Sequence, residues 1–245
     1  MSIAVTKGKI STTGKNLTSG SEDLLTASVF GVLRYLPAEL LLFPILKHAK
    51  NLNDDLYKPD TSVQDSEIDF EFWPGLNTSE PDVVIKTGMK ELIFIESKFN
   101  SGKSGSYNTE REGKKSTAKY DQLYREFKDL VDYSDGNNNS IIKTLIYLTA
   151  HRTMPKDDFI SSYKAVKESE LSSEIFKKNT YWLSWFDVWK VCKDFKSEDE
   201  NPFYMLMVRD LIEFLEKLEL KHFTGFSCER EIEPINKPIF YEANN

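Results

Sequence analysis

The sequence predicts an α/β protein with a central mixed sheet flanked by helices and with additional helices at its C-terminal side. Two observations carry this prediction. Segments with helical and strand patterns follow one another in the order helix, three strands, helix, strand and then helices. The chain of 245 residues is 40% apolar and 13% aromatic, so it can bury a sizeable core. We expect one continuous organisation without repeats.

The first predicted elements are two helices and three strands. Apolar side chains recur at helical spacing from Ser21, whose first turn is acidic, until Pro37, and a second helix is expected over 40–49. Gly88 marks a turn between two runs rich in β-branched residues, which favours an antiparallel meander. The three strands are expected over 66–73, 80–86 and 91–98.

The remaining elements are a helix, a strand and further helices. Segment 118–131 is amphipathic, whereas 141–149 is nearly all apolar, as is typical of a strand buried on both faces. Helices are expected over 185–195 and over 202–220, where Pro202 suits a helix start. The aromatic run 181–186, with Trp189, should pack in the core as a terminal strand and helix, although an exposed member could stack on a base.

The chain divides into a polar arm over 1–20, a core over 21–195 and a C-terminal helical extension over 196–245, packed on the core. Its longest apolar run, 36–46, is short and interrupted by two prolines, so neither a signal peptide nor a membrane span is expected. Cys192 and Cys228 stand far apart and indicate neither a disulfide framework nor a CxxC zinc site. A reducing, cytoplasmic location fits this cysteine usage.

A Gly-Lys-Ser triplet at 102–104 resembles the end of a nucleotide-binding P-loop. That motif requires glycine at the position where this chain has Ser97. A P-loop also leads directly into a helix, and the residues after 104 are a poor helix start. A P-loop nucleotide hydrolase is therefore the weakest of three hypotheses.

The strand expected over 91–98 ends in a carboxylate and an amine. Because alternate side chains share a face of a strand, Glu96 and Lys98 are neighbours at the end of an apolar run. A hairpin at Gly88 can bring Asp82 alongside Glu96. Magnesium takes oxygen ligands from one or two carboxylates, and a nearby lysine can position or deprotonate a water for attack on a phosphodiester. These residues are the candidate metal site.

The pair Pro81-Asp82, followed 14 residues after the aspartate by Glu96-x-Lys98, resembles the motif of the PD-(D/E)XK nuclease superfamily. That superfamily has a restriction-endonuclease-like core of helix, three strands, helix and strand, and the predicted order over 21–149 is similar to it. The resemblance implies that Asp82 and Glu96 bind the metal and that Lys98 assists the attacking water.

The same resemblance implies further site residues. Many members add an acidic residue from the first helix, which here is Glu22 with Asp23 as the alternative, and many carry a glutamine on the following helix, which here is Gln122. Ser97 is a further predicted metal position. One exonuclease subgroup has tyrosine four residues after that glutamine, whereas this chain has Glu126. That subgroup's processive activity is therefore not carried over.

Basic residues concentrate just after the motif, in a chain whose net charge is −7. Segment 98–125 has seven basic and three acidic residues, so it carries a local charge of +4. Such a segment can hold a phosphate backbone, and its binding should weaken with salt. The predicted nucleic-acid contacts are Lys103, Ser104, Lys114, Lys115 and Lys119.

The sequence thus predicts a Mg²⁺- or Mn²⁺-dependent nuclease that hydrolyses phosphodiester bonds, with DNA as the expected substrate and endonuclease activity favoured. The alternative is a catalytically inactive PD-(D/E)XK-like module that binds nucleic acid or a protein. In that case Glu96 and Lys98 would be an ordinary ion pair, and Glu22 a favourable charge at a helix start. A homodimer is compatible with either hypothesis. Fold alone does not choose among restriction, repair, mobile-element processing and antiphage defence.

Overall fold

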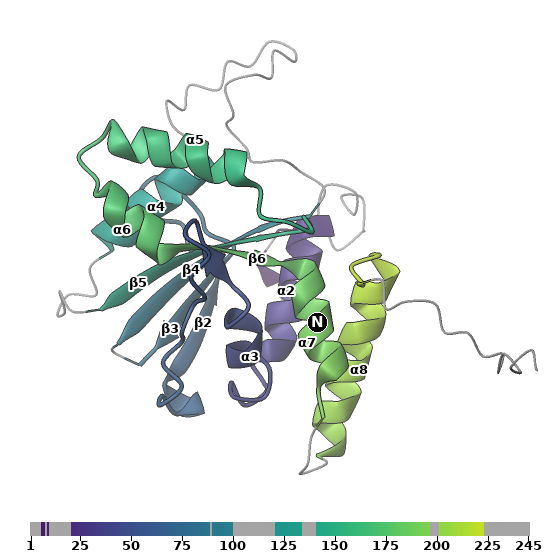
Figure 1. Cartoon of the computed structure of the whole chain (residues 1–245). Helices are drawn as coiled ribbons and strands as arrows, with labels where there is room; N and C mark the ends of the chain where they lie inside the picture. Colours follow the sequence, from purple (N-terminus) through teal and green to yellow (C-terminus); the bar gives the residue numbers. More distant parts are fainter. Residues whose placement is uncertain are drawn as a thin grey trace, which may run out of the picture.

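The computed structural model describes residues 6–7, 9, 21–88, 90–99, 121–133, 141–196 and 201–222. These residues form an α/β protein with a six-stranded mixed sheet in the order β1-β6-β5-β4-β3-β2. Helices cover both faces of the sheet (Figure 1). The predicted α/β class is therefore confirmed.

The sheet combines an antiparallel meander with parallel strands. β2 (Ile68–Phe72), β3 (Val83–Thr87) and β4 (Glu91–Lys98) are consecutive antiparallel neighbours, as predicted. Gly88, in the turn between β3 and β4, has a φ of 58°, a conformation that glycine adopts without steric cost. β5 (Ile142–Thr149) and β6 (Thr180–Ser184) continue the sheet in parallel. The two-residue β1 (Lys50–Asn51) adds an antiparallel edge that no sequence pattern had indicated.

The helices separate into two layers (Figure 1). One face of the sheet carries α2 (Ser21–Leu33), α3 (Leu42–Leu46), α7 (Trp185–Asp194) and α8 (Pro202–Lys217). The other carries α4 (Gln122–Asp132), α5 (Lys156–Lys167) and α6 (Ser173–Asn179). A short 3₁₀ turn, η1 (Asp65–Glu67), precedes β2.

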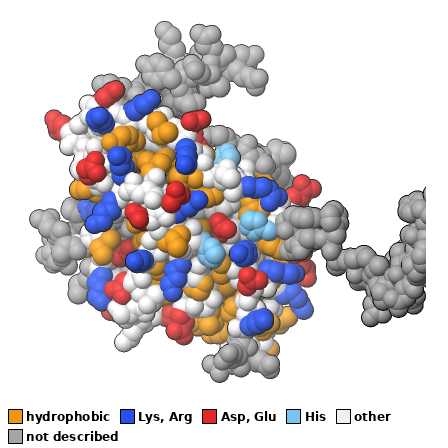
Figure 2. Space-filling view, viewed as in Figure 1, with side chains coloured by type: hydrophobic (Ala, Val, Ile, Leu, Met, Phe, Trp, Pro, Cys, Tyr) orange, Lys and Arg blue, Asp and Glu red, His pale blue; other side chains and the backbone are white. Residues whose placement is uncertain are grey.

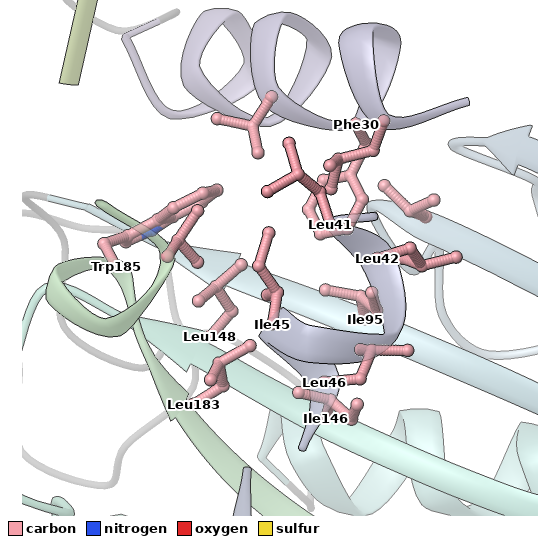
Figure 3. Close-up of a cluster of buried hydrophobic side chains, with 14 of the residues drawn as sticks. Phe30, Leu41, Leu42, Ile45, Leu46, Ile95, Ile146, Leu148, Leu183 and Trp185 are labelled. Carbon is pink, nitrogen blue, oxygen red and sulfur yellow. The ribbon is translucent and has the colours of Figure 1, made fainter. Parts of the chain in front are cut away.

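Two apolar cores lie on the two faces, and β4 contributes to both. Ile93 and Ile95 pack into the larger core with α2 and α3, shown in Figure 3. Leu92 and Phe94 pack into the smaller core with α4. The alternation predicted for this strand is therefore confirmed, and both of its faces are buried. A strand covered in this way can hold polar side chains at its end away from bulk water.

Several element predictions are confirmed with shifted bounds. The helix expected over 40–49 is shorter, because α3 spans Leu42–Leu46. The aromatic run does pack as a strand followed by a helix, β6 and α7, with Trp182 and Trp185 buried. α8 packs on the larger core through Val208, Leu211 and Leu215. Residues 223–245 of the expected C-terminal extension lie outside the described part.

The surface mixes both signs of charge. Figure 2 shows basic and acidic side chains interspersed over one face of the molecule. None of the described helices is long and apolar enough to cross a membrane.

Candidate functional site

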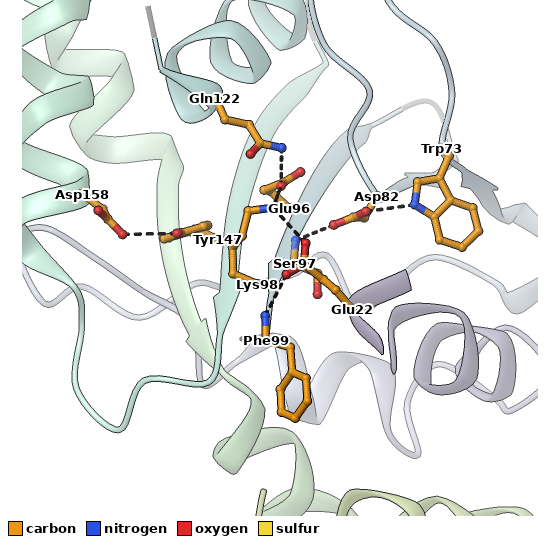
Figure 4. Close-up of polar contacts among 10 residues, drawn as sticks. All are labelled: Glu22, Trp73, Asp82, Glu96, Ser97, Lys98, Phe99, Gln122, Tyr147 and Asp158. Atoms are coloured by element: carbon orange, nitrogen blue, oxygen red, sulfur yellow. Dashed lines mark hydrogen bonds and ion pairs between the residues drawn. The ribbon is translucent and has the colours of Figure 1, made fainter. Parts of the chain in front are cut away.

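A group of charged and polar side chains, most of them buried, lies where β3 begins and β4 ends (Figure 4). We call it the β4-end cluster. The register pairs Val83 with Ile95, so the next pair outward is Asp82 with Glu96. The hairpin therefore brings Asp82 alongside Glu96, as predicted from the sequence. The cluster comprises Glu22, Asp82, Glu96, Lys98, Gln122 and Glu126.

Asp82 is fixed by two hydrogen bonds, one to each carboxylate oxygen. Trp73 donates its indole Nε1–H to Oδ1 over 2.9 Å, and the Ser97 backbone N–H donates to Oδ2 over 2.8 Å. The Trp73 backbone N–H also donates to the Asp82 carbonyl over 3.0 Å. Trp73 has a φ of 48°, an uncommon conformation for a bulky residue. This strained residue holds the aspartate in one orientation.

Lys98 joins the two acidic elements of the cluster. Its ammonium lies 2.5 Å from Glu96 Oε1 and 3.0 Å from Glu22 Oε1. Glu22, in the first turn of α2, also accepts the Phe99 N–H over 3.0 Å. The structure thus places Glu22, and not Asp23, in direct hydrogen-bonding contact with Lys98. Burial works to lower the pKa of Lys98, but Glu96 and Glu22 outweigh that effect and raise it.

Gln122 reaches the cluster from the start of α4. Asp121 caps this helix by accepting the Tyr124 N–H over 3.0 Å, and Ser162 of α5 donates its hydroxyl to the same carboxylate over 2.9 Å. The start of α4 is therefore fixed from two sides. In this position the Gln122 amide donates to Glu96 Oε1 (Figure 4). The predicted helix glutamine thus contacts the predicted metal ligand.

Glu126 lies one helical turn after Gln122 and is the cluster residue that sequence reasoning did not select. Its side chain is 0% exposed and lies beside the Glu96 carboxyl and the Gln122 amide. Neither carboxylate oxygen has a hydrogen bond of normal geometry within the described residues. The same holds for Glu96 Oε2. Burial raises the pKa of Glu126 to about 7. Burial also raises the pKa of Glu96 well above its usual range, and the Glu126 charge adds to the rise.

Asp129 lies a further turn along the same side of α4 and binds the loop before Asp82. Its carboxylate accepts the backbone N–H groups of Thr78 and Ser79 over 2.9 and 2.7 Å. It also accepts both of their hydroxyls, over 2.9 and 2.7 Å. This buried carboxylate is fully hydrogen-bonded, so it fixes the loop to α4 three residues before Asp82.

An open pocket of about 440 Å³ adjoins the cluster. Gln122 and Glu126 line it together with Arg125, whose buried Nε has no hydrogen bond within the described residues. The loop held by Asp129 forms the opposite wall. The pocket gives solvent and small ions a path toward the α4 side of the cluster.

The electrostatics of the cluster favour a cation. Burial raises the pKa of Asp82 well above its usual range, and the neighbouring Glu96 adds to the rise. Carboxylates buried together resist ionisation unless a positive charge joins them. The single ammonium, on Lys98, is already shared between Glu96 and Glu22.

The residues present fit a magnesium-type cation. In the described ranges, no three His, Cys, Asp or Glu side chains form a ready-made metal cage. Magnesium needs only one or two carboxylates, because it keeps several waters, whereas structural zinc needs four protein ligands. Glu96 Oε2 is a buried acceptor without a partner beside Asp82, which is the kind of atom such a cation requires. The Ser97 hydroxyl is buried without a hydrogen bond in the described part, and its metal role stays a prediction.

The predicted nucleic-acid contacts cannot be placed in the site. Lys103, Ser104, Lys114, Lys115 and Lys119 all lie in 100–120, outside the described residues. The 102–104 triplet lies there too. No protein-family model matches the chain, and no curated protein or solved structure matches it at significant similarity.

Proposed function

We propose that the protein is a divalent-cation-dependent nuclease that hydrolyses phosphodiester bonds, with DNA as its substrate, at the β4-end cluster. One observation carries the proposal. Asp82 and Glu96 are buried side by side at the ends of two antiparallel strands, next to Lys98. Glu96 Oε2 has no hydrogen bond of normal geometry in the described residues.

The order of elements supports the same proposal. α2 is followed by β2, β3 and β4, then by α4 and β5. This is the order of the restriction-endonuclease-like core of the PD-(D/E)XK superfamily, which the sequence resembles. Gln122 and Glu22 reach the cluster from the helices that the resemblance implies.

Each residue of the cluster has a chemical task in this proposal. A bound Mg²⁺ or Mn²⁺ polarises the phosphodiester and makes water a better nucleophile. Asp82 and Glu96 supply the anionic oxygens that hold the cation, and Gln122 fixes the orientation of Glu96. Lys98 presents an ammonium beside them, which can orient a water or stabilise charge that develops on the phosphate.

The second candidate is a binding module without catalytic activity. The observation that favours it is the position of Lys98, whose ammonium is already paired with two carboxylates. A buried ion-pair network of this kind can be purely structural. The two candidates differ in whether a divalent cation joins the cluster and whether DNA is cut.

Incubation of the purified full-length chain with circular and linear DNA, in magnesium and in chelator, tests the proposal. We expect magnesium-dependent cleavage that the Glu96→Gln variant abolishes. Glu91→Gln is the matched control, because Glu91 is also a buried glutamate of β4 but lies at the opposite end. Cleavage of the circle identifies an endonuclease. Equal cleavage by wild type and Glu96→Gln would contradict the assignment of the site.

The basic segment after β4 provides a test of DNA as the substrate. Replacing Lys103, Lys114 and Lys115 together by alanine should weaken DNA binding. It should also reduce the salt dependence by roughly one unit of slope per lost phosphate contact. Binding measured across a series of salt concentrations checks this. An unchanged slope would place the path of the DNA elsewhere.

A further inference from the structure

Arg125 is a half-buried cation that forms no part of the β4-end cluster. It follows Gln122 by three residues on α4, and its side chain lines the pocket of about 440 Å³ beside the cluster. Its Nε is buried and has no hydrogen bond within the described residues. A guanidinium nitrogen that loses water without gaining an acceptor is costly, and most buried polar groups have a partner. The side chain is therefore placed for an acceptor that comes from solution.

The acidic side chains of the same pocket are engaged elsewhere. Glu80 forms an ion pair with Lys9. Glu126 lies beside the Glu96 carboxyl, to which it is coupled by hydrogen bonding. Both carboxylates line the pocket together with Arg125, yet neither forms an ion pair with it in the described structure. Arg125 is thus the charged group of this pocket that lacks a counter-charge in the described part of the chain.

The walls of the pocket are fixed against each other. Asp129 of α4 accepts four hydrogen bonds from the loop on the opposite wall, two from Thr78 and two from Ser79. The Thr78 hydroxyl also donates to the Arg125 backbone carbonyl over 3.5 Å. The backbone on both sides of the pocket is therefore ordered before a ligand binds, which lowers the entropic cost of binding.

A phosphate is the anion that this position fits. A guanidinium presents its N–H groups in a planar fork that matches two phosphate oxygens, and it stays protonated throughout the physiological pH range. Gln122 contacts Glu96, the predicted cation ligand, and Arg125 lies about 4.5 Å further along the helix axis. Consecutive phosphates of one DNA strand are about 3.4 Å apart along the duplex axis. When one phosphate is at the cluster, its neighbour in the strand therefore comes within reach of Arg125.

We propose that Arg125 binds the phosphate next to the scissile one. This inference rests on the proposed function and adds a substrate requirement to it, because the site then selects a nucleic-acid strand over an isolated phosphodiester. The role of Arg125 is binding and positioning. A strand held at two successive phosphates has fewer ways to place its scissile bond against the cluster.

Single-turnover cleavage of synthetic duplexes by the full-length chain tests the inference. The main cut is first mapped on an unmodified duplex, and duplexes with one neutral methylphosphonate at each phosphate flanking that cut are then compared. In wild type, one of these replacements should slow cleavage at the mapped position by about tenfold or more, because a charge-assisted hydrogen bond is lost. Arg125→Gln should cut the unmodified duplex about as slowly, and the same methylphosphonate should not slow it further.

Two further variants complete the test. Arg125→Lys keeps the charge without the planar fork, so it should retain part of the rate and part of the sensitivity to the methylphosphonate. Arg209→Gln is the matched control, because Arg209 is an exposed arginine of α8, on the other face of the sheet. It should behave as wild type on every duplex. Circular dichroism and thermal melting show that each variant is folded.

The outcomes separate this inference from the proposed function. Loss of methylphosphonate sensitivity in Arg125→Gln, with Arg209→Gln intact, supports the inference. If Arg125→Gln cuts as fast as wild type, or cuts more slowly but is equally sensitive to both methylphosphonates, Arg125 does not bind the neighbouring phosphate and the nuclease proposal stands. The same conclusion follows if neither methylphosphonate slows wild type. If wild type cuts no DNA in magnesium, the proposed function fails and this inference fails with it.

Discussion

The two ends of β4 each bury a glutamate, and the protein treats the two side chains differently. Glu91, at the amino end, accepts hydrogen bonds from the hydroxyls of Tyr57 and Thr144. Glu96, at the carboxyl end, is bonded through Oε1, whereas its Oε2 faces other carboxylates and lacks a regular bond in the described residues. Burial raises the pKa of both, but that of Glu96 rises much further.

The two carboxylates differ in what compensates their burial. Neutral hydroxyls satisfy Glu91 and place no charge beside it, so its burial needs nothing further from solution. Glu96 lies beside Asp82 and Glu126, and this grouping of carboxylates makes ionisation of each unfavourable, an effect that a bound cation would offset. Groups held at such a cost are typical of functional sites.

Lys98→Ala should have the largest effect. We expect cleavage to slow by about a hundredfold or more, because the reacting groups lose their positioned ammonium. Affinity for Mn²⁺ should stay equal or rise, since a positive charge that competes with the cation disappears. Single-turnover cleavage and calorimetry measure the two effects.

The matched control for this lysine is Lys90→Ala, which removes an exposed ion pair with Asp60 near the opposite end of β4. Solvent screens an exposed pair, so neither cleavage nor stability should change much. If Mn²⁺ affinity collapses together with the rate in Lys98→Ala, the lysine holds the cluster together and has no separate catalytic role.

Asp129→Ala tests the same difference between two carboxylates on α4. Asp129 is fully hydrogen-bonded, whereas Glu126, one turn away, is not. The substitution leaves the Thr78 and Ser79 N–H groups without their acceptor, so the free energy of unfolding should fall by about 2–3 kcal/mol. Urea denaturation measures this change. Mn²⁺ affinity should fall as well, because the loop before Asp82 loosens.

Asp132→Ala is the control on the same helix, because Asp132 forms an exposed ion pair with Lys128 at 2.7 Å. Its removal should leave the free energy of unfolding nearly unchanged, because solvent screens the pair. A loss of stability in Asp129→Ala without any change in Mn²⁺ affinity would show that the loop does not position Asp82.

The sequence predicts β4 well. The bounds expected over 91–98 match it residue for residue, and its continuous apolar run is typical of a strand with both faces buried. β1 could not be predicted, since two residues are too few to show a period. The α3 bounds differ because this short helix, which contains Pro44, is fixed by packing of its apolar residues and not by propensity.

At the site, the sequence identifies the residues that belong to a known motif and misses those defined by three-dimensional neighbours. Asp82, Glu96 and Lys98 are brought together as predicted, whereas Trp73 and Glu126 were not selected. Nothing in the sequence shows that the Trp73 indole reaches Asp82. A signal for Glu126 does exist, because its i+4 spacing from Gln122 puts the two on one helix face.

Tyr57→Phe tests whether the hydrogen bond to Glu91, at the amino end of β4, stabilises the fold. The substitution removes the hydroxyl that donates to Glu91, so the free energy of unfolding should fall by about 1–2 kcal/mol. Glu126→Gln, which removes an unsatisfied buried charge at the other end, should cost less or stabilise the metal-free chain. Urea denaturation in chelator compares the variants. If Tyr57→Phe leaves the free energy of unfolding unchanged and Glu126→Gln lowers it, the carboxylate that stabilises the fold lies at the carboxyl end of β4 and not at the amino end.

The smallest expected effect is the pH dependence that Glu91 contributes. Burial raises its pKa above the ordinary value of 4.5, so the folded chain holds this proton more tightly than the unfolded chain. The resulting stability is fully present below pH 4.5 and is lost as pH rises through the folded pKa. Glu91→Gln removes this contribution to the pH dependence. Over the whole titration the contribution amounts to about 1.4 kcal/mol for each unit by which the folded pKa exceeds the unfolded pKa.

Urea denaturation of wild type and Glu91→Gln in chelator, at intervals from about pH 4 to pH 7, measures the difference. The variant should keep the slope contributed by Asp82, Glu96 and Glu126, because their raised pKa values act in the same direction. Adding Mn²⁺ should flatten that remaining slope, since a cation replaces the protons at the β4-end cluster, and should leave the Glu91 difference unchanged. A metal-sensitive Glu91 difference would mean that the two ends of β4 are coupled, contrary to the separation of roles argued above.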